Sequence, residues 1–518
     1  MRHRSSGVLL HVTSLPGPHG SGDMGSHARA FVDDLAASGQ RWWQMLPVGP
    51  PGYGESPYSA QSAFAGNPDL VDLESLGVPI DAHAFPVHEV DFVATQPFRA
   101  RHLRRAFDAF TERGERTDEA RELRAFCKRE AEWLDDFALF AALKRAHDDV
   151  EWTRWPARLA HRDEAALERA RVEHREAIAF AKFAQWQFDR QWSALRAHAA
   201  SRGVGLIGDL PIFVAHDSAD VWQHRELFDL DDAGLPRSVA GVPPDYFSAD
   251  GQRWGNPLYR WGVLAKTGYR WWVRRMRAAL RRFDVVRLDH FIGFVRYWKI
   301  PAEDDTARNG RWMKGPGRPL FDAIRAGLGG DLPLIAEDLG AVTPAVTRLR
   351  RELRLPGMRI LQFAFGTDPQ AAAFLPHAHT RTSVVYTGTH DNDTIVGWFE
   401  DEGGTPGSPR SREAAAMERA AALAYLGRSE TPTGALPTDV PTDIHWDIHW
   451  DMVRLAQASV ARTAIVPMQD LLGLGSQARM NSPGRPGGNW RFRVAPGFFS
   501  PALRDRLLAS TRTYGRCK

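Results

Sequence analysis

The chain has 518 residues, of which 43% are hydrophobic and 25% are charged. These proportions are typical of globular proteins and exclude disordered and fibrous ones. Lysine and arginine together number 66, and aspartate and glutamate number 63, so the formal charge is only +3. A charge so close to balance indicates neither nucleic acid nor an anionic membrane as a partner.

The two cysteines, Cys127 and Cys517, are too few for a disulfide framework or a cysteine-based metal site. The apolar run near the N-terminus, GVLLHV, is shorter than the core of a signal peptide and is typical of a strand. No stretch approaches the roughly 18 apolar residues that a membrane span needs. We therefore predict a cytoplasmic protein that does not bind a membrane.

Short apolar runs bounded by Gly, Pro or Asp alternate with helical stretches along the chain. The predicted strands are residues 7–12, 42–48, 205–214, 285–288, 334–336, 359–364, 383–387 and 463–468. Eight buried strands separated by helices predict a (β/α)8 barrel, an α/β fold, rather than an open sheet.

Two long gaps between the predicted strands mark insertions into one catalytic barrel that spans residues 1–518. The first insertion, 68–203, carries apolar residues at helical spacing among mixed charges, which predicts a helical subdomain. The second, 215–283, is also predicted as mostly helical and contains the loop 241–254, GVPPDYFSADGQRW. Its prolines and glycines are typical of a flexible lid. Too few residues follow the eighth strand for a C-terminal β-sandwich domain.

The active site of such a barrel lies at the carboxyl ends of its strands. Asp209, Asp289, Glu337 and Asp391 all stand at or just after predicted strand ends. Buried like charges repel, so packing alone would not gather them. Paired carboxylates cleave glycosidic bonds, one attacking the sugar and the other protonating the leaving oxygen. Arg287 lies on the same side of its strand as Asp289 and would keep that carboxylate ionised.

Residues of these types also serve purely structural purposes. A carboxylate at one strand end is often part of a structural salt bridge, and most of the 18 tryptophans are expected in the core. Aromatic rings beside fixed polar groups are nevertheless what a sugar-binding cleft needs. The arginine-rich stretch 274–282 indicates the outer face of a barrel helix rather than a nucleic-acid site.

Several motifs resemble those of known enzymes. The strings RLDH, AEDLG and THDND resemble conserved regions II, III and IV of the α-amylase clan, and GDLPIFVAHDSADVW replaces region I. Phe213 and Val214 stand where the clan has Asn-His, which points to its amylomaltase branch. Longer strings, including SGVLLHVTSLPGPHGSGDMG, PGYGESPYSAQSAFAGNP and NSPGRPGGNWRFR, are similar to the 4-alpha-glucanotransferase (amylomaltase) family, from about Gly7 to Arg493.

The resemblance implies roles for the catalytic residues. Asp289 would be the nucleophile and Glu337 the general acid and base. Asp391 would be the third carboxylate, which holds sugar hydroxyls and stabilises the distorted ring. Arg287 and His390 would contact the transition state, and the role of Asp209 would be that of a further subsite or structural carboxylate.

It also implies residues that bind the substrate. Tyr246 and Phe247, in the predicted lid, would stack on glucose rings in the acceptor subsites, and Tyr58 would lie on the donor side. Trp254 and Asn256 are further candidates in the cleft. No Gly-rich phosphate loop follows a strand, and the family requires no metal, so we expect no cofactor.

The expected reaction is transfer with retention of configuration. The donors would be α-1,4-glucans or maltooligosaccharides, and the acceptor would be the 4-hydroxyl group of glucose or a maltooligosaccharide. A retaining enzyme holds its two carboxyl groups roughly 5–5.5 Å apart. Two alternatives remain, a hydrolase with the same carboxylates and a glucan-binding protein without activity. A lid that excludes water favours the transferase.

Overall fold

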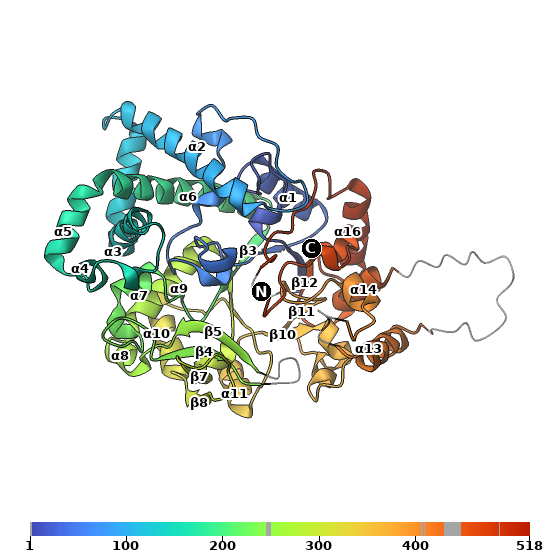
Figure 1. Ribbon diagram of the computed structural model, residues 1–518. Helices are drawn as coiled ribbons and strands as arrows, with labels where there is room; N and C mark the ends of the chain where they lie inside the picture. The colour runs from blue at the N-terminus through green and yellow to red at the C-terminus, as the bar shows by residue number, and fades with distance from the viewer. Residues whose placement is uncertain are drawn as a thin grey trace, which may run out of the picture.

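The computed structural model describes residues 3–244, 250–405, 408, 410–428, 447–485 and 487–517. Its centre is a barrel of parallel strands: β1 (Ser5–Leu9), β2 (Trp42–Gln44), β3 (Gly205–Leu210), β6 (Val285–Leu288), β9 (Leu334–Ala336), β10 (Gly357–Ile360), β11 (Ser383–Tyr386) and β12 (Thr463–Pro467). The barrel closes in the order β1-β12-β11-β10-β9-β6-β3-β2 (Figure 1). The predicted (β/α)8 barrel is confirmed.

The strand boundaries differ from prediction by a few residues. β6 and β9 have the predicted bounds, whereas β3 ends at Leu210 because Pro211 has no N–H to continue the ladder. β10 begins at Gly357 and ends at Ile360, and residues 361–364 form a 3-10 turn instead of strand. The prediction therefore placed this strand too far along the chain.

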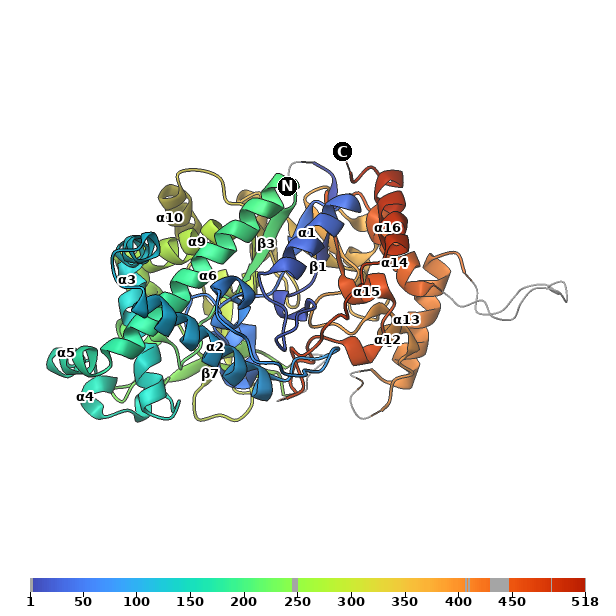
Figure 2. The same cartoon turned by 90° about the horizontal axis from the view of Figure 1, so that it is seen from above.

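Helices fill the segment between β2 and β3. They are α2 (Phe92–Glu112), α3 (Asp118–Ala146), α4 (Ala157–Ala160), α5 (Glu164–Glu173) and α6 (Arg175–Ser201). Asp91 and Thr117 cap α2 and α3 by accepting the backbone N–H groups of Ala94 and Ala120. Both views show these helices on one side of the barrel, away from α13 (Arg412–Tyr425), α14 (Ile448–Ala458) and α16 (Pro501–Thr513) (Figure 2).

A second, antiparallel sheet was not predicted. Its strands, β4 (Ser238–Val242), β5 (Gln252–Pro257), β7 (Arg296–Pro301) and β8 (Arg311–Lys314), pair in the order β5-β4-β7-β8. The first two follow β3 and the last two follow β6, so the sheet joins two connections of the barrel. The predicted lid loop 241–254 therefore includes the ends of β4 and β5, and residues 245–249 at its tip, with Tyr246 and Phe247, lie outside the described residues.

The remaining helices surround the barrel. They are α1 (Ser26–Ala37), α7 (Ala219–Gln223), α8 (Trp261–Lys266), α9 (Arg270–Arg282), α10 (Arg318–Leu328), α11 (Pro344–Glu352), α12 (Ile395–Glu400) and α15 (Met468–Leu472). The barrel strands are buried on both faces, which is why they appear as continuous apolar runs in the sequence. Among the described helices, none combines the length and apolar character that a bilayer crossing requires.

Candidate active site

The four predicted carboxylates lie at one end of the barrel. Asp209 is the last residue but one of β3, Asp289 directly follows β6, and Glu337 directly follows β9. The register pairs Asp209 with Arg287 and Leu288 with Ala336. Because Asp289 and Glu337 follow this last pair, they emerge from adjacent strands, as the sequence predicts.

Arg287 joins two of these carboxylates. Its Nη1 atom donates to Asp209, at 2.8 and 2.7 Å from the two carboxylate oxygens, and to Asp289 Oδ1 at 2.9 Å. Its Nε atom lies 3.4 Å from Met358 Sδ. Burial lowers the pKa of Arg287, but the two carboxylates outweigh this effect and hold the pKa well above its ordinary value. The guanidinium therefore remains charged beside Asp289.

Glu337 is held by two backbone N–H groups, one directly after Asp289 and one on its own loop. The N–H of His290 donates to Glu337 Oε2 at 2.6 Å, and the N–H of Leu339 donates to Oε1 at 2.9 Å. Burial raises the pKa of Glu337 well above its usual range, and the neighbouring Asp289 carboxylate adds to the rise. A carboxyl group in this environment retains a proton that it can donate.

Of the two carboxyl groups, Asp289 is the weaker base. Burial raises its pKa to about 6, although the Arg287 charge opposes the rise. Its side chain is 27% exposed, whereas that of Arg287 is 4% exposed, so the carboxylate faces the cleft and the guanidinium lies behind it. The two carboxyl groups thus differ in the way that acid and nucleophile must differ.

His390 and Tyr58 connect Asp391 to Asp209. The Tyr58 hydroxyl donates to Asp209 Oδ2 at 2.8 Å and lies 2.8 Å from His390 Nε2. His390 Nε2 is 3.1 Å from Asp391 Oδ2, and the rings of Tyr58 and His390 are stacked 5.2 Å apart. Burial opposes ionisation of Asp391, but His390 and a hydrogen bond from Asn481 outweigh it and hold its pKa below the usual range. Asp391 is therefore ionised.

The aromatic and amide candidates on β5 differ in what they contact. The Trp254 ring meets the His290 ring edge-on, with 4.9 Å between the ring centroids. Trp254 is also 37% exposed to solvent. The Asn256 amide donates to the Val214 carbonyl at 2.9 Å. Trp254 therefore contacts the residue that follows Asp289, whereas the Asn256 amide holds β5 to the loop after β3.

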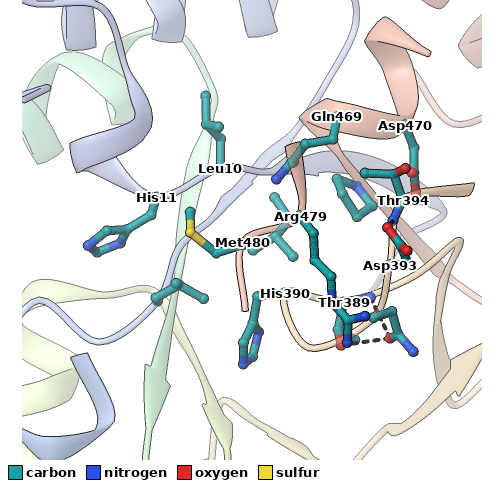
Figure 3. Close-up of a pocket in the computed structure, with 14 residues that line it drawn as sticks. Leu10, His11, Thr389, His390, Asp393, Thr394, Gln469, Asp470, Arg479 and Met480 are labelled. Carbon is teal, nitrogen blue, oxygen red and sulfur yellow. Dashed lines mark hydrogen bonds between the residues drawn. The ribbon is translucent and has the colours of Figure 1, made fainter. Parts of the chain in front are cut away.

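Other residues near the carboxylates were not predicted. His11, two residues after β1, and Gln469, in α15, line a small cavity beside His390. Figure 3 shows Arg479 extended toward the loop that carries His390, and its Nη2 atom donates to the Asp391 carbonyl at 2.7 Å. Asn481 belongs to the NSPGRPGGNWRFR motif, but neither motif nor spacing indicates that it reaches Asp391. No group of three or more His, Cys, Asp or Glu side chains in the described part of the chain is arranged to hold a metal ion.

Comparison with known proteins identifies the family. A family model described as 4-alpha-glucanotransferase matches residues 10–498. The 4-alpha-glucanotransferase of Thermus thermophilus is 48% identical over 513 residues, which cover 98% of each chain. The 4-alpha-glucanotransferase of Synechocystis is 42% identical, over 99% of this chain and 98% of the relative.

A solved structure agrees over the same length. The amylomaltase from Streptococcus agalactiae in complex with acarbose superposes with a TM-score of 0.88 at 35% identity, covering 99% of this chain and 100% of that one. The amylomaltase from Corynebacterium glutamicum, at 19% identity and a TM-score of 0.76, shares the fold. These matches confirm the resemblance carried by the sequence motifs: the chain belongs to the 4-alpha-glucanotransferase family.

Proposed function

We propose that this member of the 4-alpha-glucanotransferase family transfers a segment of an α-1,4-glucan or maltooligosaccharide to the 4-hydroxyl group of glucose or a maltooligosaccharide, by retaining double displacement. Asp289 is the nucleophile, Glu337 the acid and then the base, and Asp391 holds the sugar ring. The observation that carries the proposal is the ionised Arg287 beside Asp289, next to a Glu337 with a strongly raised pKa. We expect no metal or nucleotide to take part.

The first displacement forms a glycosyl-enzyme. An oxygen of Asp289 attacks the anomeric carbon, the bond from that carbon to the glycosidic oxygen breaks, and the Glu337 proton passes to the departing oxygen. In the second displacement, the 4-hydroxyl of the acceptor attacks the same carbon. Its proton passes to Glu337 and Asp289 leaves, which restores both groups to their starting states.

The separation of the two carboxyl groups tests retention. We expect a high-resolution crystal structure to place the Asp289 and Glu337 carboxyl groups roughly 5–5.5 Å apart. A separation above about 6.5 Å leaves room for a water between carboxylate and sugar and would indicate inversion instead.

The choice of acceptor depends on surfaces beyond the carboxylates. A transferase must keep water from the glycosyl-enzyme while binding a sugar well. The exposed face of Trp254 supports stacking on an acceptor glucose, and we assign Tyr246 and Phe247 to the same acceptor side. Tyr58 and His390, with Asp209 behind them, would bound the donor side. The activity for which the relatives are named favours transfer over the hydrolase and over the inactive binding protein.

Incubation with pure maltotriose tests the activity. We expect glucose together with maltopentaose and longer chains, while the total of reducing ends stays constant. Rising reducing ends with only shorter products would show a hydrolase. An Asp289→Asn variant is the control, since it should lose turnover and still bind maltotriose in calorimetry. Binding without turnover in the unmodified protein would support the binding-protein alternative.

A further inference from the structure

The segment formed by residues 479–490, apart from residue 486, contacts the loop that carries His390 and Asp391. Arg479 Nη2 donates to the Asp391 carbonyl at 2.7 Å, and the Asn481 N–H donates to the His390 carbonyl at 3.1 Å. The Asn481 side chain adds a bond from Nδ2 to Asp391 Oδ1 at 2.6 Å. Two of these three bonds hold the backbone, and only the last reaches the carboxylate itself.

The segment does not need the Asn481 side chain for its own shape. Arg479 Nε donates to the Asn481 carbonyl at 2.7 Å, and the Trp490 N–H donates to the Met480 carbonyl at 2.8 Å. The turn in between is held by Asn489, whose Oδ1 accepts the Ser482 N–H at 2.9 Å. The segment therefore has two asparagines with different tasks, one that closes the turn and one that points to Asp391.

Asp391 receives a donor on each oxygen. Asn481 donates to Oδ1, and His390 Nε2 lies 3.1 Å from Oδ2. The side chain of Asp391 still has 43% of its surface exposed, so these donors fix its plane without covering it. An amide is a neutral donor and adds no charge that would compete with a sugar for the carboxylate.

We propose that Asn481 is a positioning residue that fixes the Asp391 carboxylate in the orientation in which it meets the sugar. The inference rests on the role proposed above for Asp391. It deepens that role, because it ascribes the fixed plane of this carboxylate to an amide donor that lies ninety positions further along the chain.

Several other titratable or charged groups lie near Asp391 and affect how activity depends on pH. His390 lies on the same loop as Asp391, and Arg479 lies on the segment after β12. The other groups are on or just after β6, or in the loop after β2. These neighbouring groups are His390, Arg287, Asp289, Tyr58 and Arg479. Because they are common to the natural protein and its variants, each variant is compared with the natural protein at the same pH.

The decisive variant is Asn481→Asp, which replaces the amide by a carboxyl group of the same size. At acid pH one proton is shared by the two carboxyl groups, and the new O–H donates to Asp391 as the amide does. As the pH rises, that proton is lost and the two carboxylates repel. We expect the variant's kcat on maltotriose, divided by that of the natural protein, to be near one at the acid end and to fall about tenfold to a hundredfold as the pH rises.

Asn489→Asp is the matched control, because it adds the same charge to the same turn without touching Asp391. Its ratio to the natural protein should not change with pH. Activity of Asn481→Asp that returns when the pH is lowered again would show that the variant stays folded. A flat ratio for Asn481→Asp, or the same pH-dependent fall in both variants, would overturn the proposal.

Binding of acarbose, measured by calorimetry over the same pH range, separates this inference from the proposed function because it needs no turnover. If the natural protein does not disproportionate maltotriose, the proposed function fails. A loss of acarbose affinity with rising pH in Asn481→Asp alone would still support the positioning role, and equal affinities in both variants at every pH would refute it.

Discussion

Arg287 shows how one side chain can give two neighbouring carboxyl groups, those of Asp289 and Glu337, different pKa values. It contacts Asp209 and Asp289 and counteracts the effect of burial on the pKa of both Asp289, the proposed nucleophile, and Glu337, the proposed acid. Glu337 is further from this charge and keeps the larger rise in pKa. The division of labour between the two carboxyl groups thus follows from which of them the guanidinium touches.

The pKa values of this pair predict a bell-shaped pH profile. The proposed mechanism needs Asp289 without its proton and Glu337 with it. Since burial raises the pKa of Asp289 to about 6, kcat/KM on maltotriose should fall as the pH drops through about 6. It should fall again as the pH rises through the raised pKa of Glu337. An acid limb near pH 4, the usual range of an aspartate, would contradict the assignment.

The proton of Glu337 has its own test. We expect Glu337→Gln to lose about 10²- to 10⁴-fold in activity on maltotriose, because the leaving oxygen is no longer protonated. A glycosyl fluoride needs no acid to depart, so α-maltosyl fluoride should still glycosylate Asp289 in this variant. Because Glu337 is also the proposed base of the second displacement, the comparison uses the first turnover alone. If the initial burst of fluoride falls as much as the activity on maltotriose, Glu337 is not the acid.

Among the elements, α9 shows how an arginine-rich helix serves the fold. Arg275 is buried and donates to the carbonyls of Pro211 and Ile212 at the end of β3. Arg281 makes two bonds to Glu130 in α3, at 2.8 and 2.7 Å. The helix therefore connects the barrel to the helices between β2 and β3, and its charge is satisfied within the protein, in keeping with the barrel helix that the sequence indicates.

Another arginine, Arg516 after α16, holds together the elements at the opposite end of the strands. Arg516 is fully buried and donates to carbonyls of β1, of α14 and of the turn before β12; these are Ser5, Ala456, Gln457, Ser459, Ala461 and Arg462. Arg516→Ala should lower the free energy of unfolding by about 2–4 kcal/mol, because a fully buried side chain is removed and several buried carbonyls each lose one of their donors.

The fall in stability is measured from the midpoint of denaturation in guanidinium chloride. Arg512→Ala, at an exposed position of α16, is the control and should change stability by less than about 0.5 kcal/mol. Equal midpoints for the two variants would show that Arg516 is not needed to hold the strand ends. Activity at low temperature should survive in both, since neither residue lies at the carboxyl ends of the strands.

For the molecule as a whole, the sequence predicts the barrel better than what surrounds it. Strands buried on both faces appear in the sequence as continuous apolar runs. Carboxylates mark the strand ends, because burying a charge in the core is energetically costly. β5 and β8 leave no such run, because their residues are mostly exposed or half-buried. The contact from Asn481 to Asp391 could not be predicted from the sequence either, because it depends on how a segment ninety residues away folds back onto this loop.

The pairing of β1 with β12 has a consequence for synthesis. Ser5 to Leu9 lie in register with Thr463 to Pro467, so the first barrel strand made by the ribosome meets one of its two partners only after 458 further residues have been added. Until then β1 has an open edge, and an open strand edge invites pairing with other chains. Asp289 and Glu337 are likewise synthesised long before the loop of Asp391 and the segment of Asn481. The full set of residues at this site is present only after the segment of Asn481 has been synthesised.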